Sequence, residues 1–457
     1  MVSWLLNLVW MSLLTALSPW LVYRRFVQRK SIGDWGQKLL GRFPVRTGAA
    51  RCVWLHAVSV GEVLQLPQIV AELKRRDPSM DVVISATTTT GFGVARQKFP
   101  NAIVVYWPLD FSWAVSAAFS RLRPNLVVLV ELELWPNFLR VARQRQIPVA
   151  LVNGRITERS VRGYRRIRPV IRWMLSRLEW IAVQNAVYAR RFEELGGPTE
   201  RIQITGSVKF DGVETERDNP RTGRFRELLG IQGHPPIFLA GSTHAPEERF
   251  AVVAWQAAQK VFPNLRLVLA PRHAERFDEV ARLVREELGL ALIRRSALPD
   301  ANSGTTPESP DKIDDSKVPA VILLDSLGEL SACWGLADVA FVGGSLTDRG
   351  GQSMIEPAAF GAALLFGPNT WNFADMVSSL LERQAAEVVT DGMDLARRIV
   401  ECLKDPTAAA ERGSRARELV LESQGATSRT VSGIMKILDE GKDAESEKPE
   451  TRRRVAA

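Results

Sequence analysis

The chain has 457 residues, of which 46% are hydrophobic and 24% are charged. This length is too great for one ordinary core and predicts two domains of about 200 residues each, while the charged fraction argues against a polytopic membrane protein. The formal net charge of +9 indicates an anionic partner, for which nucleic acid, anionic lipid and phosphorylated substrates are all candidates. The three cysteines and four histidines show no metal-ligand spacing, so we expect a reducing compartment, no disulfide framework and no metal.

The first 23 residues carry no charge and are rich in leucine, valine and tryptophan. Such a segment can cross a bilayer core about 30 Å thick, and a buried core helix is the alternative. A cleaved signal peptide would begin with basic residues, whereas here they follow the apolar run, starting at Arg24 and Arg25. The positive-inside rule therefore predicts a transmembrane anchor at 1–23, with the body in the cytoplasm. A basic juxtamembrane segment at 24–50 is expected to lie on anionic lipid.

After this segment, short apolar runs alternate with amphipathic stretches. The expected strands of the first half are 53–56, 82–86, 104–107, 126–131, 148–153 and 180–184. The expected helices are 61–76, 91–99, 111–122, 137–144 and 165–178. Strand–helix alternation at this spacing predicts a parallel sheet covered on both faces.

The alternation pauses at 211–230, a polar stretch that we interpret as an interdomain linker. It resumes with strands expected at 236–240, 266–270, 290–293, 321–324 and 339–342. The predicted fold class is therefore α/β, with doubly wound domains at 51–215 and 216–438 and a ligand cleft between them. Two polar segments, 296–318 and 439–457, are expected to be disordered.

Candidate catalytic carboxylates follow two strands of the first half. Ser59-Val60-Gly61-Glu62 has the pattern of a capping box, with Ser59 as N-cap and Glu62 at N3, and the local pattern alone favours this structural role. A carboxylate at such a strand end can also serve as a general base, and the sequence does not separate the two roles. Glu131 and Glu133 lie two residues apart at another strand end, where each would raise the pKa of its neighbours.

Small or basic residues follow other strands, at positions typical of anion contacts. Ser207 and Lys209 lie where the two domains join and could contact a phosphate or carboxylate. Arg272 and His273 follow one expected strand of the second half, and Ser242 follows another. Each signal is weak alone, and together they indicate a nucleotide site in the second half.

A glycine-rich stretch follows the strand at 339–342. Its candidate phosphate contacts are Gly343, Gly344, Ser345, Gly350 and Gly351. Glycines let backbone N–H groups approach a phosphate, and a helix start adds its positive dipole end. Glu356, one turn into the following helix, is placed to accept hydrogen bonds from a ribose. The G-x-G-x-x-G fingerprint is absent, which argues against a dehydrogenase.

Eight arginines lie between Arg155 and Arg177. Such a run is usually a solvated face, and nucleic-acid binding is an alternative, but no nucleic-acid module is recognisable. Beside a membrane anchor, a phosphorylated lipid is the more economical partner.

Taken together, these residues resemble the Kdo (3-deoxy-D-manno-octulosonic acid) transferase family of lipopolysaccharide synthesis. The resemblance covers about residues 1–430. It rests on LHAVSVGE at 55–62, ELWPN at 133–137, PRHAERF at 271–277 and the glycine-rich stretch at 350–356. The first two motifs are specific in combination.

The resemblance implies a GT-B glycosyltransferase fold, with CMP-Kdo held mainly by the C-terminal domain and the lipid A precursor, lipid IVA, held by the N-terminal domain. It implies an inverting reaction that needs no metal or other cofactor and involves no nucleic acid. The family's catalytic base falls on Glu62, and Glu133 would support it. The segments that carry the candidate anion contacts named above map onto donor-binding segments of the family, whereas Arg155 and Arg159 are candidates for acceptor phosphates.

One motif departs from the family pattern. Gln352-Ser353-Met354 stands where relatives have His-Asn-Pro, which leaves the role of Gln352 open. Two other functions are considered. A GT-B enzyme that uses a UDP-sugar is disfavoured by the pairing of SVGE with ELWPN, and a degenerate membrane-tethered binding protein is disfavoured by the intact strand-end Glu, Lys and Arg residues.

Overall fold

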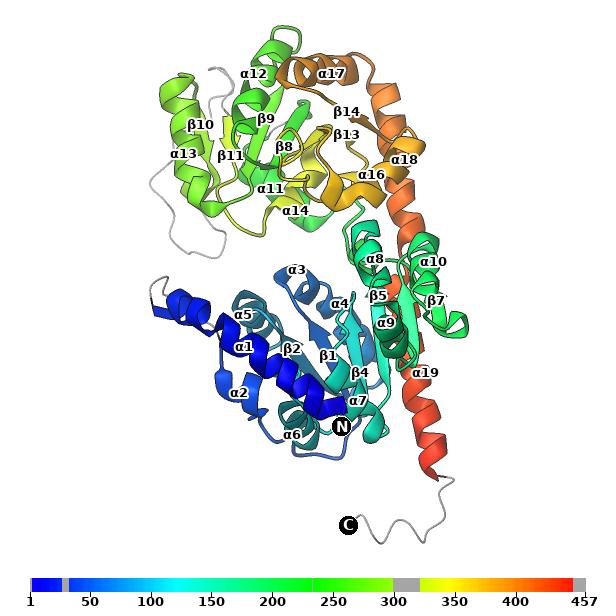
Figure 1. Ribbon diagram of the computed structural model, residues 1–457. Coiled ribbons are helices and arrows are strands. Elements are labelled where there is room, and N and C mark those ends of the chain that lie inside the picture. The colour runs from blue at the N-terminus through cyan, green and yellow to red at the C-terminus, as the bar shows by residue number, and fades with distance from the viewer. Residues whose placement is uncertain (1, 27–32, 232, 299–320, 447–457) are drawn as a thin grey trace. The chain divides into compact units, whose positions relative to one another are not determined.

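The computed structural model describes residues 2–26, 33–231, 233–298 and 321–446 of the chain (Figure 1). They form two compact units, one of Met1–Gly212 with Gln424–Ala457 and the other of Val213–Ser423. Each unit is built on its own seven-stranded parallel sheet. This confirms the predicted α/β class with two doubly wound sheets.

The sheet of the first unit has the strand order β3-β2-β1-β4-β5-β6-β7. Its strands are β1 (Cys52–Ala57), β2 (Asp81–Ala86), β3 (Ile103–Tyr106), β4 (Leu126–Val130), β5 (Val149–Gly154), β6 (Trp180–Val183) and β7 (Ile202–Ile204). Every residue of β1, β4, β5 and β6 is buried, as expected of parallel strands covered on both faces. The strand order reverses between β1 and β4, and ligands of such sheets bind beyond the carboxyl ends at that point.

The helices of the first unit cover both faces of this sheet. They are α1 (Val2–Phe26), α2 (Trp35–Leu40), α3 (Val60–Val63), α4 (Leu66–Arg76), α5 (Thr89–Lys98), α6 (Ser112–Leu122), α7 (Pro136–Gln144), α8 (Glu158–Arg165), α9 (Arg168–Leu175), α10 (Ala186–Glu194) and α19 (Ala426–Ser446). The helix predicted at 61–76 is broken into α3 and α4, and the helix predicted at 165–178 is the shorter α9. Pro67 and Pro169 occupy the first turns of α4 and α9, where a proline fits a helix start but not an interior.

The C-terminal helix α19 belongs to the first unit, although the chain has by then passed through the whole second unit. Its residues Val431, Ile434 and Leu438 are buried in the same apolar cluster as Leu73 of α4. The predicted domain limits would have placed 424–438 in the second unit. Likewise, the tail predicted to be disordered from residue 439 continues as helix to Ser446, and 447–457 lie outside the described residues.

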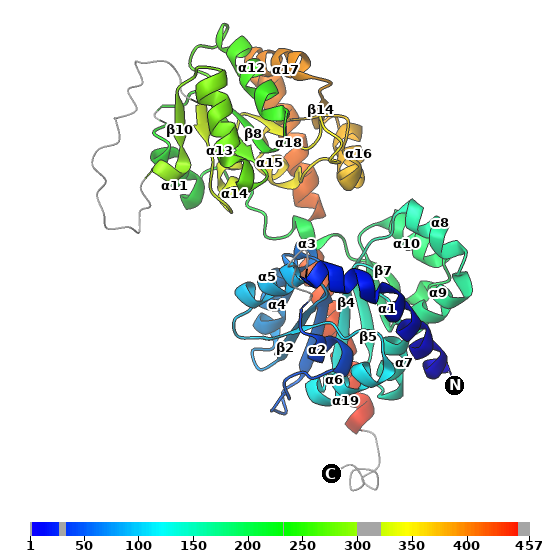
Figure 2. The ribbon, with the colours of Figure 1, turned by 60° about the vertical axis from the view of Figure 1, so that its left-hand side comes forward.

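Helix α1 lies along the surface of the first unit in both Figures 1 and 2. Asn7 is buried, donates to the Ser112 hydroxyl at 2.8 Å and accepts from the Ser112 N–H at 3.0 Å. Trp10 Nε1 donates to Asp110 at 3.3 Å, and the same carboxylate accepts the Asn137 N–H at the start of α7. Polar side chains of α1 are therefore used to dock it onto α6 and α7.

The transmembrane anchor predicted at 1–23 is not supported. Within the described part of the chain, no helix combines the length and the apolar character that a bilayer crossing requires. The segment contains Asn7, Ser18 and Pro19 among its apolar residues. In the predicted juxtamembrane segment, 27–32 lie outside the described residues.

The second unit has the strand order β10-β11-β9-β8-β12-β13-β14. Its strands are β8 (Ile237–Thr243), β9 (Arg266–Pro271), β10 (Leu292–Arg294), β11 (Val321–Leu323), β12 (Val339–Val342), β13 (Ala363–Phe366) and β14 (Ala386–Val388). Its helices are α11 (Pro220–Leu228), α12 (Glu247–Gln259), α13 (Phe277–Arg282), α14 (Leu330–Cys333), α15 (Ile355–Ala359), α16 (Ala374–Glu382), α17 (Gly392–Lys404) and α18 (Pro406–Ser423). The order reverses between β8 and β12, so this sheet also has a switch point.

Two sequence predictions differ from this unit. The linker predicted at 211–230 contains α11, which Asn219 caps by accepting two backbone N–H groups and which buries Phe225. Of the segment predicted to be disordered at 296–318, residues 299–318 lie outside the described residues.

Candidate functional site

The carboxylates that follow β1 and β4 gather at the switch point of the first sheet. β1 leads into α3, which carries Glu62, and β4 ends immediately before Glu131, whose φ of 62° turns the chain sharply. Burial raises the pKa of Glu133, and the negative charges of Glu62 and Glu131 raise it further. The three glutamates are thus close enough to act on one another and form one acidic cluster.

Glu62 occupies the capping box that its motif predicts. The Ser59 hydroxyl donates to its Oε1 at 2.8 Å, and the Val58 N–H donates to its Oε2 at 2.8 Å. Burial raises the pKa of Glu62, these two hydrogen bonds oppose the rise, and the charge of Glu131 adds to it. Glu62 therefore caps the start of α3, as its motif predicts. Because its carboxylate is only half-buried, it also remains part of the acidic cluster.

The predicted contact Lys209 lies in the first unit, beside this cluster. Its Nζ is 3.6 Å from Glu131 Oε1, and about a third of its side chain is exposed (35%). Ser207 starts the short η2 turn (Val208–Phe210), where its hydroxyl accepts the Lys209 N–H at 3.4 Å. Lys209 therefore places a positive charge against the acidic cluster.

His56, which lies on β1 in the same motif, takes no part in the acidic cluster. Its Nδ1 lies 3.0 Å from the Ser85 hydroxyl, and its ring stacks on Trp107 with centroids 3.7 Å apart. Burial lowers the pKa of His56 to about 3. It is therefore a neutral core residue at physiological pH.

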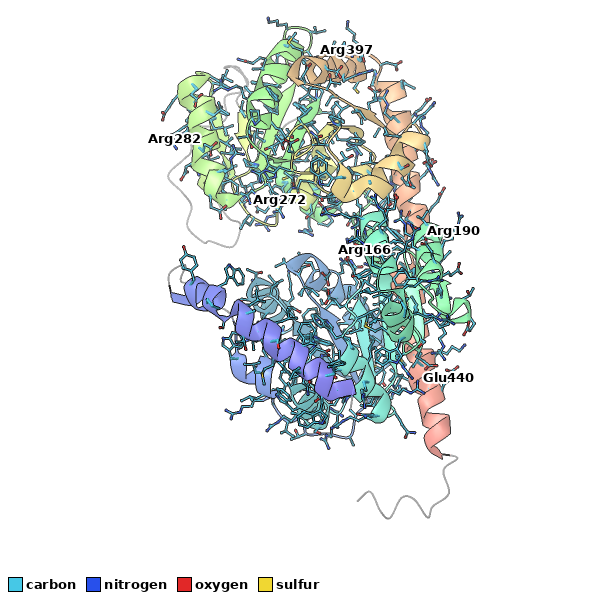
Figure 3. All side chains as sticks on the ribbon, viewed as in Figure 1. Arg166, Arg190, Arg272, Arg282, Arg397 and Glu440 are labelled. Carbon is cyan, nitrogen blue, oxygen red and sulfur yellow. The ribbon has the colours of Figure 1, made fainter. Side chains whose placement is uncertain are left out.

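The two predicted acceptor contacts differ in their surroundings. Arg155 is half-buried, and its Nε donates to the Tyr188 hydroxyl at 3.2 Å. Arg159 and Arg162 are exposed on α8, and Arg166, which is labelled in Figure 3, is exposed at its C-cap. Only Arg159 and its exposed neighbours are therefore placed to meet a ligand from solvent.

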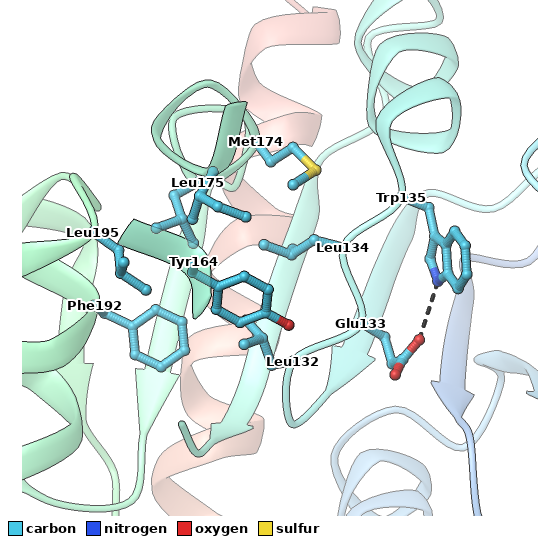
Figure 4. A pocket seen from close by; sticks show the side chains of 10 residues that line it. Leu132, Glu133, Leu134, Trp135, Tyr164, Met174, Leu175, Phe192 and Leu195 are labelled. Carbon is cyan, nitrogen blue, oxygen red and sulfur yellow. Dashed lines mark hydrogen bonds between the residues drawn. The ribbon is translucent and has the colours of Figure 1, made fainter. Parts of the chain in front are cut away.

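A cavity of about 240 Å³ opens beside the acidic cluster (Figure 4). It was not predicted from the sequence. Its lining residues come from the loop after β4 and from α8, α9 and α10 or its C-cap, and they are Leu132, Glu133, Leu134, Trp135, Tyr164, Ile171, Met174, Leu175, Phe192 and Leu195. Glu133 contributes the only carboxylate of this lining. That carboxylate accepts a hydrogen bond from Trp135 Nε1–H at 3.1 Å.

In the second unit, a buried glutamate joins the loops that follow β8 and β12. Glu247 has no exposed surface (0%), and its two carboxylate oxygens accept four backbone N–H groups. The donors are His244, Gly344, Ser345 and Leu346, at 2.7–3.0 Å. Burial raises the pKa of Glu247, and the four hydrogen bonds oppose the rise. Its motif was not recognised as functional in the sequence.

These contacts correct the role predicted for the first glycine pair. The N–H groups of Gly344 and Ser345 donate to Glu247, and that of Gly343 donates to Gly241 O at 2.9 Å, so none is available to a phosphate. Ser345 is fully buried. A Cβ at Gly343 would lie 2.5 Å from Thr243 Cα, so glycine is required here by the close approach of two loops.

The other predicted residues of this unit form a polar group at the same sheet edge. Arg272 Nε donates to Gln352 Oε1 at 3.2 Å, and Gln352 Nε2 lies 3.4 Å from His244 Nε2. The His244 ring meets that of His273 edge-on at 5.2 Å. Burial lowers the pKa of His244, and the neighbouring His273 lowers it further. Ser242 precedes this group with a φ of 55°. Gln352, whose role the sequence left open, links Arg272 to His244.

The second glycine pair lies in the segment between β12 and α15, and Glu356 lies in the first turn of α15. Gly350 and Gly351 have φ values of 83° and 78°, and a Cβ at Gly350 would lie 2.5 Å from Trp371 Nε1. The Gly351 N–H donates to Gly344 O at 2.8 Å. Burial raises the pKa of Glu356, while the charge of Arg221 acts in the opposite direction. Among the residues that the structure describes, no group of three or more His, Cys, Asp or Glu side chains could hold a metal ion.

Sequence comparison finds relatives of this chain among known proteins. A family model described as 3-deoxy-D-manno-octulosonic-acid transferase matches residues 34–212. The 3-deoxy-D-manno-octulosonic acid transferase of Haemophilus influenzae is 33% identical over 391 residues, which is 85% of this chain and 87% of that protein. The enzyme of the same name from Bordetella pertussis is 33% identical over 438 residues, which is 92% of this chain and 97% of that protein.

Among solved structures, UDP-GlcNAc 2-epimerase from Neisseria meningitidis bound to UDP-GlcNAc has a TM-score of 0.54. The match covers 81% of this chain and 99% of that chain, at 11% identity. At this identity the likeness concerns the fold alone.

Proposed function

The chain belongs to the 3-deoxy-D-manno-octulosonic acid transferase family, and on that premise we propose that it transfers Kdo from CMP-Kdo to the lipid A precursor, lipid IVA. Family membership makes it a glycosyltransferase of lipopolysaccharide synthesis, as the sequence resemblance implied. The nucleotide donor, the acceptor and the residue roles below belong to the proposal.

The observation that carries the proposal is the acidic cluster at the switch point between β1 and β4. Glu62 accepts the proton of an acceptor hydroxyl, and the oxygen attacks the anomeric carbon of Kdo from the face opposite CMP. The bond between that carbon and the CMP phosphate oxygen breaks, and its electron pair leaves with CMP. Burial and Glu131 raise the pKa of Glu62, which makes its carboxylate a stronger base. Glu133 belongs to the same acidic cluster, in which the charge of Glu62 raises the pKa of Glu133.

Charge balance explains the position of Lys209. It pairs with Glu131 at 3.6 Å, and it can exchange this partner for the carboxylate of Kdo or the phosphate of the donor. In the second unit, Arg272 supplies positive charge for the leaving phosphate, and His273 lies next to Arg272 in the chain. The carboxylate of Glu356, in the first turn of α15, would accept hydrogen bonds from the ribose.

We place the enzyme at the surface of the inner membrane, where its lipid acceptor would be found. The support is α1, which exposes large apolar side chains on its outer side. These include Trp4, Leu5, Leu8 and Met11. A helix that keeps one side docked on the protein and exposes an apolar side can lie in a lipid surface.

The test is an assay of the purified full-length chain with CMP-Kdo and tetraacylated lipid A precursor, read by product mass. Glu62→Gln is the decisive variant. Glutamine can still complete a capping box, so the fold should be kept, while loss of a general base should lower turnover by roughly 10²–10⁴-fold. Near wild-type turnover in this variant would show that Glu62 is not the base.

A second measurement separates the donor classes. CMP should raise the melting temperature of the chain, and UDP at the same concentration should not. Stabilisation by UDP alone would favour a UDP-sugar transferase. Stabilisation by CMP without any transfer would favour a degenerate binding protein.

A further inference from the structure

We propose that the cavity beside Glu133 holds one acyl chain of the lipid acceptor, so that this unit reads the hydrocarbon part of the substrate as well as its sugar. The inference rests on the proposed function, because it names a subsite for that acceptor. It concerns only the first unit.

The chemistry of the lining indicates hydrocarbon. Eight of the ten lining residues are Leu, Ile, Met, Trp or Phe, and the exceptions are Glu133 and Tyr164. Phe192, Leu195 and Leu175 are fully buried at its inner end, whereas the residues of the loop after β4 are partly exposed. The lining is therefore apolar and fully buried on the side of α9 and α10, and we take the more exposed loop after β4 as the opening of the cavity.

The volume is sufficient for part of a chain. A dry apolar cavity of about 150 Å³ is large enough to take up benzene, and this cavity measures about 240 Å³. It can therefore accept several methylene groups, and its apolar lining offers few partners for the hydroxyl groups of a sugar. Such a space is left open in a folded protein only at a cost in packing, which a hydrocarbon ligand would recover.

The cavity lies beside the acidic cluster. Glu133 belongs both to the cavity lining and to the cluster that contains Glu62. A chain held in the cavity would leave it at the loop after β4, and the head group to which the chain is attached would then lie near Glu62. This is the arrangement that transfer to a sugar hydroxyl of an acylated head group requires.

Charge on the neighbouring helix favours an anionic lipid over an uncharged one. α8 contributes Tyr164 to the cavity wall, while its exposed positions carry Arg159 and Arg162. Within the described residues, neither arginine lies within 4 Å of a carboxylate, in contrast to Arg165, which pairs with Glu194. One short helix thus offers an apolar contact on one side and unpaired positive charge on another. A phosphorylated, acylated head group complements both.

One residue of the cavity lining contacts α1. Trp135, a lining residue, packs against Trp10 of α1 with ring centroids 5.6 Å apart. The outer side of the same helix exposes Trp4, Leu5 and Leu8. The cavity lining is therefore in contact with the helix that we place in the lipid surface.

The first experiment fills the cavity. Met174→Trp adds bulk at a lining position on α9, and Val170→Trp is its matched control, since Val170 is on the same helix but is exposed and does not line the cavity. Both variants are assayed with the tetraacylated disaccharide bisphosphate and with its fully deacylated form. Each methylene group excluded from an apolar site should weaken binding about fourfold.

For Met174→Trp we therefore expect kcat/KM to fall at least roughly tenfold with the acylated acceptor. It should stay within about twofold of wild type with the deacylated acceptor, and Val170→Trp should change neither value. Equal losses with both acceptors, or no loss with either, would overturn the acyl-chain site while leaving the transferase function intact. A wild-type enzyme that is inactive with both acceptors would instead refute the proposed function.

The second experiment needs no variant and so does not depend on the folding of Met174→Trp. The wild-type chain is irradiated with tetraacylated acceptor that carries a diazirine near the end of one acyl chain, and the labelled peptides are mapped. Label on residues 132–135 and 171–175, suppressed by excess unlabelled acceptor, supports the proposal. Label confined to α1 would show that the chains stay on the outer surface. If a diazirine fatty acid gives the same label and excess acceptor does not suppress it, the cavity is a site for free fatty acid. This outcome, or label confined to α1, overturns the proposal.

Discussion

Glu62 illustrates how one side chain can hold a helix start and remain available for chemistry. Its Oε1 and Oε2 each accept one hydrogen bond from the start of α3. A carboxylate has about four lone-pair positions, so two remain for an acceptor hydroxyl. The capping role also fixes the orientation of the carboxylate before substrate binds, which is the property that a general base needs.

The pH dependence of activity should report the charge around Glu62. A general base works only when deprotonated, so kcat/KM should fall as pH drops through the raised pKa of Glu62, at a midpoint above the ordinary value of 4.5. Glu131→Gln removes a negative neighbour and should move this midpoint to lower pH. The measurement is a pH profile of kcat/KM, with Glu158→Gln on exposed α8 as control. A midpoint that stays or rises in Glu131→Gln would contradict the arrangement.

Glu247 is predicted to position the donor loops without touching the donor. Glu247→Gln would place a side-chain NH₂ against backbone N–H donors in a fully buried site, and leaving such groups unsatisfied costs about 1–3 kcal/mol. We expect a lower melting temperature and weaker binding of CMP, roughly tenfold or more. Calorimetry with CMP checks this, and Glu275→Gln, an exposed residue nearby, is the control. Unchanged CMP affinity would show that the loops do not depend on Glu247.

At the scale of elements, α19 matters because it closes the first unit from the far end of the chain. Gly433 lies where α19 meets β6, and a Cβ there would come within 2.3–2.7 Å of the Trp180 ring. An aromatic ring packed between a helix and a sheet cannot yield easily. The glycine is therefore a consequence of close packing between helix and sheet.

Gly433→Ala should consequently destabilise the first unit by about 1–3 kcal/mol. Gly441→Ala is the matched control on the same helix, since a Cβ there meets nothing within 4 Å. Because alanine favours helix over glycine, the control should gain up to about 1 kcal/mol. Urea unfolding of both variants, followed by circular dichroism, provides the measurement. Equal effects of the two substitutions would mean that α19 is not packed on Trp180 in solution.

At the scale of the whole molecule, the two units differ in how the chain builds them. The second unit is continuous from Val213 to Ser423, whereas the first needs both 1–212 and 424–446. Without α19, the apolar faces of α4 and β6 that contact Val431 and Ile434 would be exposed to water. The first unit is therefore not complete until the end of the chain has been made.

Fragments should reproduce this difference. We expect 213–423 to fold alone and to show a cooperative thermal transition, because it contains its whole core. A fragment of 1–212 should aggregate, and fusion of 424–446 through a flexible linker should restore a soluble, cooperative fold. Size-exclusion chromatography and thermal melts check both expectations. A stable, monomeric 1–212 would show that α19 is not needed for the core.

Local patterns in the sequence determined most of the strands, the start of α3 and the positions of the strand-end motifs. β12 was predicted at its observed limits, 339–342, because a continuous apolar run bounded by glycine reports burial directly. The sequence placed Glu62 at one strand end and Glu131 with Glu133 at another, and the family resemblance paired Glu133 with Glu62. The family was identified from motifs at those same ends.

Only the tertiary structure decided which distant segments meet. Glu247 accepts hydrogen bonds from the N–H groups of Gly344 and Ser345, which lie 97 and 98 residues further along the chain. No local sequence pattern predicts such a contact. The docking of α1, the return of α19 and the cavity beside Glu133 have the same cause. Apolar periodicity shows that a segment must bury one side, but it does not say whether lipid, a sheet or another helix covers that side, because all of these remove the same apolar surface from water.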